Sequence, residues 1–596
     1  MNFFSLIHLL GLTIAISVLS ACSNSEYVDE FGMPVSTYTP DEESLGASSL
    51  PDTLYEFPAS GFFRTPFTIM LSESMNCETG GFIPTKNSPA IRTFHIDSST
   101  TIRCAIFAND SSLASETIRT YLFEKKPTIP TIFITTDPNS LFDPDTGIYM
   151  EGPNAEEKPP HKGANYWLDK EIPIFVELIE EHASNPAFSE YAGLEIFGSY
   201  SRMHEKKSVA ITFRKKYGQN KLYYRLFPKF SNLNSFKSII LRNFGNNFGN
   251  DYIRDRLAGS ISNGLNVDYQ HGRFVIVYYN GVYFGIHDMR ERANEYYFET
   301  HYGISHKKID LLKANNSISA GSADDYISLI NWLETNNLDD DKNYTYLASL
   351  IDIDNFINYM QIELFINNRD WPGNNLKKWR QSDPKSPWRW FIYDCDQAFG
   401  SSGGAATNNV FEYATSKNGT NWANAPKHTF LFRSLLKNKI FRNAFINRMT
   451  TLLQMNFEKT RIIAQIDSMM SNIKYEIPRD QKKWSLRASH MDNQLEEIKD
   501  FVKHRQAIIL SQLQDYFELD ESCPTKLSIN GSGSIQIHNL PLDKPSLTIN
   551  FFKNNPVTIT AKTLNGSTWL HWSDGDTNET KKISPCTDSE ITAFFK

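Results

Sequence analysis

The chain has 596 residues and a formal net charge of −8, and 40% of its residues are hydrophobic. This length exceeds that of one ordinary domain, so the sequence predicts a multi-domain α+β protein. The mild acidity and the absence of basic runs argue against nucleic acid as the main partner.

Residues 1–21 have the features of a secretion signal, with an apolar core from Phe3 to Ser20 that is too short for a lasting membrane helix. Leu19-Ser20-Ala21-Cys22 resembles a lipobox, which predicts lipidation of Cys22. The expected product is an exported bacterial lipoprotein that is anchored to a membrane, either in the periplasm or at the cell surface. Ordinary signal-peptidase cleavage stays the alternative, because residues 1–8 contain no lysine or arginine. Residues 22–52 are rich in Ser, Asp, Glu and Pro, which predicts a flexible tether.

Short alternating segments between turn residues predict a small β-sandwich over residues 53–126. Its expected strands are 67–71, 93–96, 100–107 and 117–123.

Residues 127–520 change from strand patterns to helix patterns, which predicts a β-rich lobe followed by a helical lobe. Asn280-Gly281 lies between two apolar runs and predicts a hairpin. Helical spacing of apolar residues predicts helices over 353–366, within 430–520 and over 492–517. Residues 524–596 return to strand patterns and predict a small C-terminal β domain.

The stretch from Asn367 to Gly400 carries the strongest functional pattern. Asp370 and Asn375 are five positions apart on a loop after a predicted helix, and Asp394 follows an aromatic strand 24 positions after Asp370. Protein kinases use Asp-x-x-x-x-Asn as a catalytic loop and a later Asp as a magnesium ligand. The alternative is structural, because Asn, Asp, Pro and Gly also form turns, and Asp-x-Asp also caps helices.

The same stretch resembles the spore-coat CotH kinase family of atypical protein kinases, together with further landmarks in the family's order over about residues 128–520. These landmarks are Leu141-Phe142-Asp143 with Gly147-Ile148-Tyr149, Lys206-Lys207-Ser208, Asn280 to Ile286, and Arg290-Glu291-Arg292. Residues 53–126 resemble the chitobiase C-terminal-like, fibronectin-type modules found beside such kinases. Such a module is expected to be a spacer, with a sugar binder as the alternative.

The resemblance implies a two-lobed kinase domain over residues 127–520 that uses ATP and Mg²⁺, with Mn²⁺ as the alternative ion. Asp370 would be the catalytic base. Asn375, with Asn374 as the alternative by one position, would bind metal together with Asp394, and Asp396 would support a second ion.

The expected nucleotide contacts lie upstream. Ser199 and Ser201 belong to a glycine turn that would approach phosphate, and Lys207 rather than Lys206 would neutralise phosphate charge, with a solvated basic turn as the alternative. Arg254 is expected to pair with Asp255 near the phosphates. Glu291 would contact nucleotide or hold Lys207 near the lobe connection, with an ion pair to Arg290 or Arg292 as the alternative.

The cysteines fit an exported chain. With Cys22 taken as the lipid site and Cys395 as a thiol between two site carboxylates, two pairs are left, Cys77 with Cys104 and Cys523 with Cys586. An oxidising compartment permits both bridges.

Two functions follow. The first is an anchored kinase that transfers the γ-phosphoryl group of ATP to Ser or Thr of an unidentified extracytoplasmic protein. The second is a catalytically inactive kinase fold that serves as a surface binding or scaffolding lipoprotein. The retained Asp370, Asn375 and Asp394 favour the first, whereas the incomplete glycine turn at Gly198 favours the second.

Overall fold

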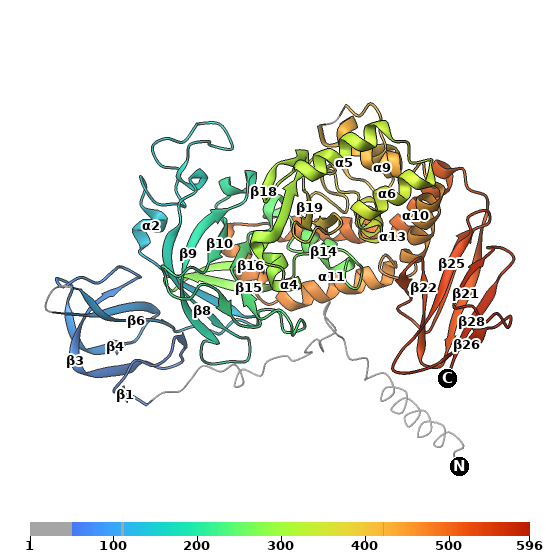
Figure 1. Cartoon of the computed structure of the whole chain (residues 1–596). Helices are drawn as coiled ribbons and strands as arrows, with labels where there is room; N and C mark the ends of the chain where they lie inside the picture. Colours follow the sequence, from blue (N-terminus) through green and yellow to red (C-terminus); the bar gives the residue numbers. More distant parts are fainter. Residues whose placement is uncertain (1–50, 109–111, 421) are drawn as a thin grey trace, which may run out of the picture.

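The computed structural model describes residues 51–108, 112–420 and 422–596. The predicted signal, the tether and Cys22 lie outside the described residues. Small β modules lie at the two ends of the molecule, and a β barrel and a helical region lie between them (Figure 1). The predicted α+β fold class is confirmed. Among the described residues, no helix is long and apolar enough to cross a membrane.

The N-terminal module is one connected six-stranded sheet. Its strands are β1 (Thr53–Leu54), β2 (Gly61–Phe62), β3 (Phe67–Thr79), β4 (Ala90–Ile96), β5 (Thr100–Phe107) and β6 (Leu113–Leu122). The first part of β3 pairs with β4 and its last residues pair with β5. Cys77 and Cys104 lie directly opposite each other in this register and form a disulfide bond.

A closed barrel follows, with the strand order β10-β13-β16-β15-β7-β8-β9. The strands are β7 (Thr131–Thr135), β8 (Ile172–Ile179), β9 (Phe188–Phe197), β10 (Ser208–Thr212), β13 (Ser238–Arg242), β15 (Gly272–Tyr279) and β16 (Val282–Glu291). Every residue of β7, β10 and β13 is buried, because both faces of these strands are covered. Asn280 and Gly281 turn between β15 and β16 with positive φ angles of 49° and 79°, as a tight hairpin requires.

A five-stranded sheet lies in the second lobe, in the order β14-β20-β19-β17-β18. Its strands are β14 (Asp268–Tyr269), β17 (Ile309–Lys313), β18 (Ile318–Ala320), β19 (Leu376–Gln381) and β20 (Arg389–Ile392). Because β19 begins directly after Asn375 and β20 ends just before Asp394, the hairpin of these two strands positions both residues.

Helices make up most of the rest of this lobe. They are α4 (Glu295–Tyr302), α5 (Asp324–Thr335), α6 (Asp341–Leu350), α7 (Ile353–Ile366), α8 (Val410–Ala414), α9 (Pro426–Leu435), α10 (Lys439–Leu452), α11 (Lys459–Ile473), α12 (Ile477–Trp484) and α13 (Ala488–Phe517). The helix α7 is buried from Asn355 to its end, so the loop that follows it starts from a fixed point. The predicted helix over residues 432–453 is divided at Asn438, whose side chain caps α10 by accepting from the N–H groups of Ile440 and Phe441.

The remaining elements are short. They are α2 (Pro138–Phe142), α3 (Arg254–Ile261), β11 (Leu222–Tyr223), β12 (Ser235–Phe236) and the 3₁₀ turns η1 (Asn165–Trp167), η2 (Tyr200–Met203), η3 (Gly245–Asn247), η4 (His306–Lys308), η5 (Ala314–Asn316), η6 (Ser401–Gly403) and η7 (Trp422–Asn424).

The C-terminal module contains two four-stranded sheets, in the orders β24-β21-β28-β26 and β23-β22-β25-β27. The strands are β21 (Ser522–Asn530), β22 (Gly533–Ile537), β23 (Leu540–Pro541), β24 (Ser546–Phe552), β25 (Val557–Thr563), β26 (Trp569–Trp572), β27 (Thr580–Ile583) and β28 (Glu590–Phe595). A disulfide bond joins Cys523 to Cys586.

Candidate functional site

The loop after α7 is held by the helix that precedes it. Asn367 ends the helix in the left-handed conformation, with a φ of 51°. The next residue, Asn368, donates from Nδ2 to Oε2 of the buried Glu363 over 3.1 Å, and its Oδ1 accepts from the backbone N–H of Asp370. Trp371 is buried and donates from Nε1 to the hydroxyl of Tyr359 over 2.7 Å. These contacts give the Asp370 carboxyl a defined position.

Asp370, Asn375 and Asp394 come together in one hydrogen-bonded unit. Asn375 donates from Nδ2 to Oδ2 of Asp370 over 3.0 Å and to the backbone oxygen of Asp394 over 2.8 Å. The alternative Asn374 is exposed and also donates to Oδ2 of Asp370, over 2.9 Å. Asn375 is buried and joins the two acids, whereas Asn374 contacts Asp370 alone.

The pKa of Asp370 is raised above its usual range. Burial is the main cause, and the nearby charge of Asp394 acts in the same direction. The hydrogen bonds from Asn374 and Asn375 act against this shift, because they stabilise the carboxylate. A carboxylate with a raised pKa is a better proton acceptor, and it is still largely ionised at neutral pH unless the shift is very large.

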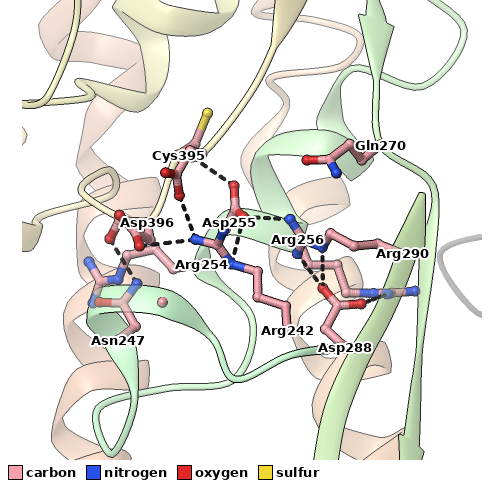
Figure 2. Close-up of polar contacts among 12 residues, drawn as sticks. Arg242, Asn247, Arg254, Asp255, Arg256, Gln270, Asp288, Arg290, Cys395 and Asp396 are labelled. Atoms are coloured by element: carbon pink, nitrogen blue, oxygen red, sulfur yellow. Dashed lines mark hydrogen bonds and ion pairs between the residues drawn. The ribbon is translucent and has the colours of Figure 1, made fainter. Parts of the chain in front are cut away.

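Arg242, at the end of β13, links the two acids after β20. Its NH2 group pairs with Oδ1 of Asp394 and, over 3.0 Å, with Oδ2 of Asp396. Its Nε lies 3.4 Å from Oδ2 of Asp255 on α3. Figure 2 shows the guanidinium group of Arg242 between Asp255 and Asp396.

Asp396 lies deeper than Asp394. It is 1% exposed, whereas the side chain of Asp394 is 28% exposed. Its Oδ2 also accepts from the backbone N–H of Asn246 over 2.9 Å. Burial and the charge of Asp394 raise the pKa of Asp396, and the charge of Arg242 acts against them. Asp394 is therefore the more accessible of the two carboxylates to a bound ion.

Further ion pairs continue from Asp255 into the barrel. Arg290 pairs with Asp255 over 2.6 Å and also with Asp288, which in turn accepts from Arg256 over 2.9 Å (Figure 2). Burial would raise the pKa of Asp255, but the charges of Arg290 and Arg242 lower it. With Asp370 included, five carboxyl groups in this network face three guanidinium groups. A raised pKa favours a proton on the buried Asp396, and the other four carboxylates still outnumber the guanidinium groups, so a cation would lower the electrostatic energy of the network.

A small hollow of about 20 Å³, partly open to solvent, lies beside this network. It is lined by Asp394 and Ile392 from the end of β20, by Asp288 and Arg290 from β16, and by Gln270. The accessible carboxylate thus borders a space between the barrel and the second lobe.

The two predicted phosphate lysines have other partners. Lys207 is 3% exposed, donates to the backbone oxygens of Arg202 and His204, and lies 4.0 Å from the centre of the Tyr166 ring. Lys206 is fully buried and pairs with Asp480 over 3.0 Å. The alternative of a solvated basic turn is therefore wrong, because both lysines are buried. The assignment of Lys207 to phosphate stays a prediction.

The glycine turn lies at the surface. Gly198 has a φ of 111°, Ser199 is exposed, and Ser201 is half-buried in η2. The turn is held by Arg202, whose Nε donates to the oxygen of Gly198 over 2.8 Å. The nucleotide contacts of Ser199 and Ser201 stay predictions.

Arg254 does not have the predicted role. It is 1% exposed and pairs with Asp251 over 3.0 Å instead of with Asp255. Its NH1 group donates to the backbone oxygens of Ala398 and Phe399. Because its guanidinium group is buried and bonded in this way, Arg254 holds the segment after Asp396 from behind and is not placed to contact nucleotide.

The predicted protein partners of Glu291, which are Lys207, Arg290 and Arg292, are also wrong, and its nucleotide contact stays a prediction. Its two carboxylate oxygens face His271 over 2.8 Å and His301 over 2.6 Å. Arg290 pairs with Asp255 and Asp288, and Arg292 pairs with Glu195. Neither histidine is marked by a sequence motif, and the only signal for Arg242 is a charged residue at the end of a buried strand.

Comparison with known proteins identifies the protein family. The CotH kinase protein family matches residues 194–509, which is more than half of the chain. The chain belongs to this family, and a kinase-like family of this kind points to phosphotransfer from ATP.

Two solved structures are similar to parts of the chain. One is the proinflammatory kinase CtkA of Helicobacter pylori, with 12% identity and a TM-score of 0.20, over 52% of this chain and 95% of that chain. The other is the HipA, HipB and operator DNA complex of Shewanella oneidensis MR-1, with 14% identity and a TM-score of 0.17, over 47% of this chain and 58% of that chain. No curated protein matches the chain.

Proposed function

We propose that the protein is a membrane-anchored kinase that transfers the γ-phosphoryl group of ATP to Ser or Thr hydroxyls of extracytoplasmic proteins. The observation that carries this proposal is the hydrogen-bonded unit of Asp370, Asn375 and Asp394, of which Asp394 lines a small hollow. Anchoring would occur through Cys22, as the lipobox predicts.

The donor atoms of the site fit Mg²⁺, with Mn²⁺ as the alternative ion. Both amide hydrogens of Asn375 are engaged, which makes its Oδ1 the atom available to a cation, and Asp394 offers a partly exposed carboxylate. Hard oxygen ligands of this kind, one or two from the protein and the rest from phosphates and water, suit Mg²⁺. The ion would supply charge neutralisation at the transferred phosphoryl group.

In this proposal Asp370 accepts the proton of the attacking hydroxyl. Its two amide partners orient the carboxylate, so positioning supplies much of the rate enhancement. Arg242 takes the place that a strand lysine has in protein kinases, since it is fixed by an acid on the neighbouring helix α3 and faces the metal-binding carboxylate.

One observation favours the alternative, an inactive kinase fold with a surface binding role. The guanidinium group of Arg242 contacts Oδ1 of Asp394, an oxygen that a cation would use. For catalysis, Arg242 must yield this oxygen when ATP and metal bind and transfer its contact to phosphate.

The test is incorporation of labelled phosphate from ATP with Mg²⁺ or Mn²⁺ by the purified chain, into itself and into candidate extracytoplasmic proteins. We expect Asp370→Ala and Asp394→Asn to reduce incorporation by at least 100-fold, in line with the loss of a catalytic base or of a ligand to the metal. Asp383→Asn is the matched control, because Asp383 lies in the exposed turn between β19 and β20 and pairs only with a surface lysine in the described structure.

Incorporation that survives both site substitutions would contradict the assignment. No incorporation, together with no change in Tm on adding ATP and metal, would favour the inactive binding protein.

A further inference from the structure

A second cluster of chemically suited side chains lies outside the proposed catalytic unit. His271, Glu291 and His301 each offer one ligand atom, and these three atoms all lie within 4.8 Å of one another. His271 lies just before β15, Glu291 ends β16, and His301 belongs to α4. Three separate elements therefore converge on one carboxylate.

The atoms are arranged so that the two rings bracket that carboxylate. Nδ1 of His271 lies 2.8 Å from Oε2 of Glu291, and Nε2 of His301 lies 2.6 Å from Oε1. The two imidazole rings are nearly parallel, with 18° between their planes and 5.3 Å between their centres. Each ring thus directs one nitrogen to a different oxygen of the same carboxylate.

The surroundings of the cluster are largely apolar and close-packed. The side chains of His271, Glu291 and His301 are 8%, 3% and 12% exposed. Phe230 lies 3.9 Å from the His271 ring and Tyr297 is stacked 3.9 Å from the His301 ring, measured between centres. A carboxylate in such a place needs a compensating positive charge.

We propose that His271, Glu291 and His301 bind a divalent transition metal ion, with Zn²⁺ as the first candidate. Two imidazoles and a carboxylate form a set of protein ligands found around zinc, with a fourth position for water or for the second carboxylate oxygen. Zinc bonds of 2.0–2.2 Å in a tetrahedral arrangement place ligand atoms about 3.4 Å apart. The three ligand atoms lie within 4.8 Å of one another, and each nitrogen is 2.6–2.8 Å from its oxygen, so binding would widen the nitrogen–oxygen distances and bring the two nitrogens closer.

The ion would take the place of the two hydrogens between the rings and the carboxylate. Binding needs the lone pairs of Nδ1 in His271 and Nε2 in His301 to face the ion, so each ring keeps its proton on the other nitrogen. Oε2 of Glu291 also accepts from the backbone N–H of His271 over 2.9 Å, which orients the carboxylate independently of the rings.

The position of the site gives it a role distinct from that of the catalytic ion. Residues 292–294 connect the last barrel strand β16 to α4, and the metal would fasten both sides of this connection. The residues next to His271, Gln270 and Gly272, line the hollow beside Asp394. The ion would thus fix the lobe connection that borders the proposed nucleotide site.

The direct test is metal analysis of the purified full chain. We expect about one equivalent of zinc per chain in the wild type, its loss after dialysis against a chelator, and a Tm that falls by several degrees and recovers when Zn²⁺ is added back. In place of zinc, Co²⁺ should give visible absorption bands typical of a four- or five-coordinate site. Wild-type protein that binds neither ion at one equivalent would overturn the proposal, whatever the variants do.

Variants then assign the ligands. His271→Ala, His301→Ala and Glu291→Gln should each weaken Zn²⁺ binding at least 100-fold in competition with a chromophoric chelator. His306→Ala is the matched control, because His306 also pairs with a carboxylate, that of Glu299 over 2.7 Å, but lies outside the cluster. Equal zinc affinity in the three ligand variants and the control would contradict the assignment.

Asp394→Asn separates this proposal from the kinase proposal. It should abolish phosphate incorporation and leave the zinc equivalent in place. A loss of zinc in Asp394→Asn would instead place the bound ion at the catalytic unit and overturn the second site.

Discussion

At the scale of single residues, the neighbours of each site carboxyl group determine whether it accepts a proton or carries a compensated charge. Asp370 is held by two amides, whereas Asp394 and Asp396 share one guanidinium group. The first arrangement produces a proton acceptor, and the second produces a partly compensated acidic pair. These differences lead to two predictions.

The first concerns the pH dependence of phosphate transfer. Asp370 must be ionised to accept a proton, so activity is present above its pKa and is lost as the pH falls through it. Asn374→Ala removes a hydrogen bond that lowers this pKa. We expect the acid side of the rate profile to move to higher pH. Asn343→Ala, at a half-buried position on α6 where the side chain donates to the backbone oxygen of Asn337, is the control, and an acid side that stays in place or moves to lower pH would contradict the role of Asp370.

The second concerns Arg242. Arg242→Ala leaves buried carboxylates without their cation, which should lower the free energy of unfolding by about 3–5 kcal/mol. Arg242→Lys keeps the charge but loses the forked contacts, so its free energy of unfolding should lie between those of the wild type and Arg242→Ala. Urea unfolding measures this effect. Arg461→Ala, which breaks the more exposed pair with Asp543, should cost less than about 1 kcal/mol.

At the scale of elements, the sequence pattern was sufficient to predict those parts of the site whose residues lie close together in the sequence. Asp370 and Asn375 share one loop, and the buried helix before it and the strand into Asp394 both follow from apolar spacing. Arg242 and Asp396 are 154 positions apart, so only the barrel brings them together. Arginine is usually a surface residue, so the sequence of α3 gave no sign that Arg254 is buried against the segment after Asp396.

The helix α7 contains a buried glutamate, Glu363, whose ionisation lowers the stability of the fold. Burial raises the pKa of Glu363 from 4.5 to about 8. Between these values the folded chain holds a proton that the unfolded chain releases, so stability is full below pH 4.5 and falls as the pH rises towards 8.

Glu363→Gln should make this slope less steep by about 1.4 kcal/mol per pH unit, because an amide does not ionise. Urea unfolding at pH 5, 6.5 and 8 measures it. The same change at the exposed Glu412 should leave the slope unaltered, and equal slopes in the wild type and in Glu363→Gln would contradict the raised pKa.

The carboxylate of Asp480 on the short helix α12 accepts hydrogen bonds from the barrel and from Tyr252. Asp480 accepts from Lys206 over 3.0 Å, from Tyr252 over 2.8 Å and from the backbone N–H of Ile286 over 2.8 Å. Asp480→Asn leaves a buried lysine uncompensated and should cost about 3–5 kcal/mol in urea unfolding. Asp467→Asn, at a surface pair with Lys499, should cost under about 1 kcal/mol, and equal losses for the two would contradict the buried role.

At the scale of the whole molecule, the β modules flank the two-lobed region, and each contains one disulfide bond. The cysteine pairs were predictable because, once Cys22 and Cys395 are set aside, the other four cysteines fall two in each β module, and both predicted bridges are confirmed. The contacts at the connection between the lobes could not be predicted from the sequence, because His271 and His301 approach Glu291 only in the folded arrangement of the barrel and α4. The domain boundaries stay predictions.

The C-terminal bridge closes a separation of 63 residues. Cys523→Ser with Cys586→Ser should lower the stability of the last module by about 2–5 kcal/mol. Calorimetry of the full chain should show one transition shifted downwards, and non-reducing electrophoresis of the wild type should show a mobility that changes on reduction. Unchanged mobility would contradict the bridges.

The central claim is that residues 370, 375 and 394 converge on a divalent ion and a triphosphate. The most direct measurement is anomalous diffraction from crystals grown with a non-hydrolysable ATP analogue and Mn²⁺. The account predicts a manganese peak within coordination distance of Asp394 and Asn375, with the γ-phosphate towards Asp370. A triphosphate bound elsewhere, or no manganese at Asp394 in crystals that contain the analogue, would contradict it.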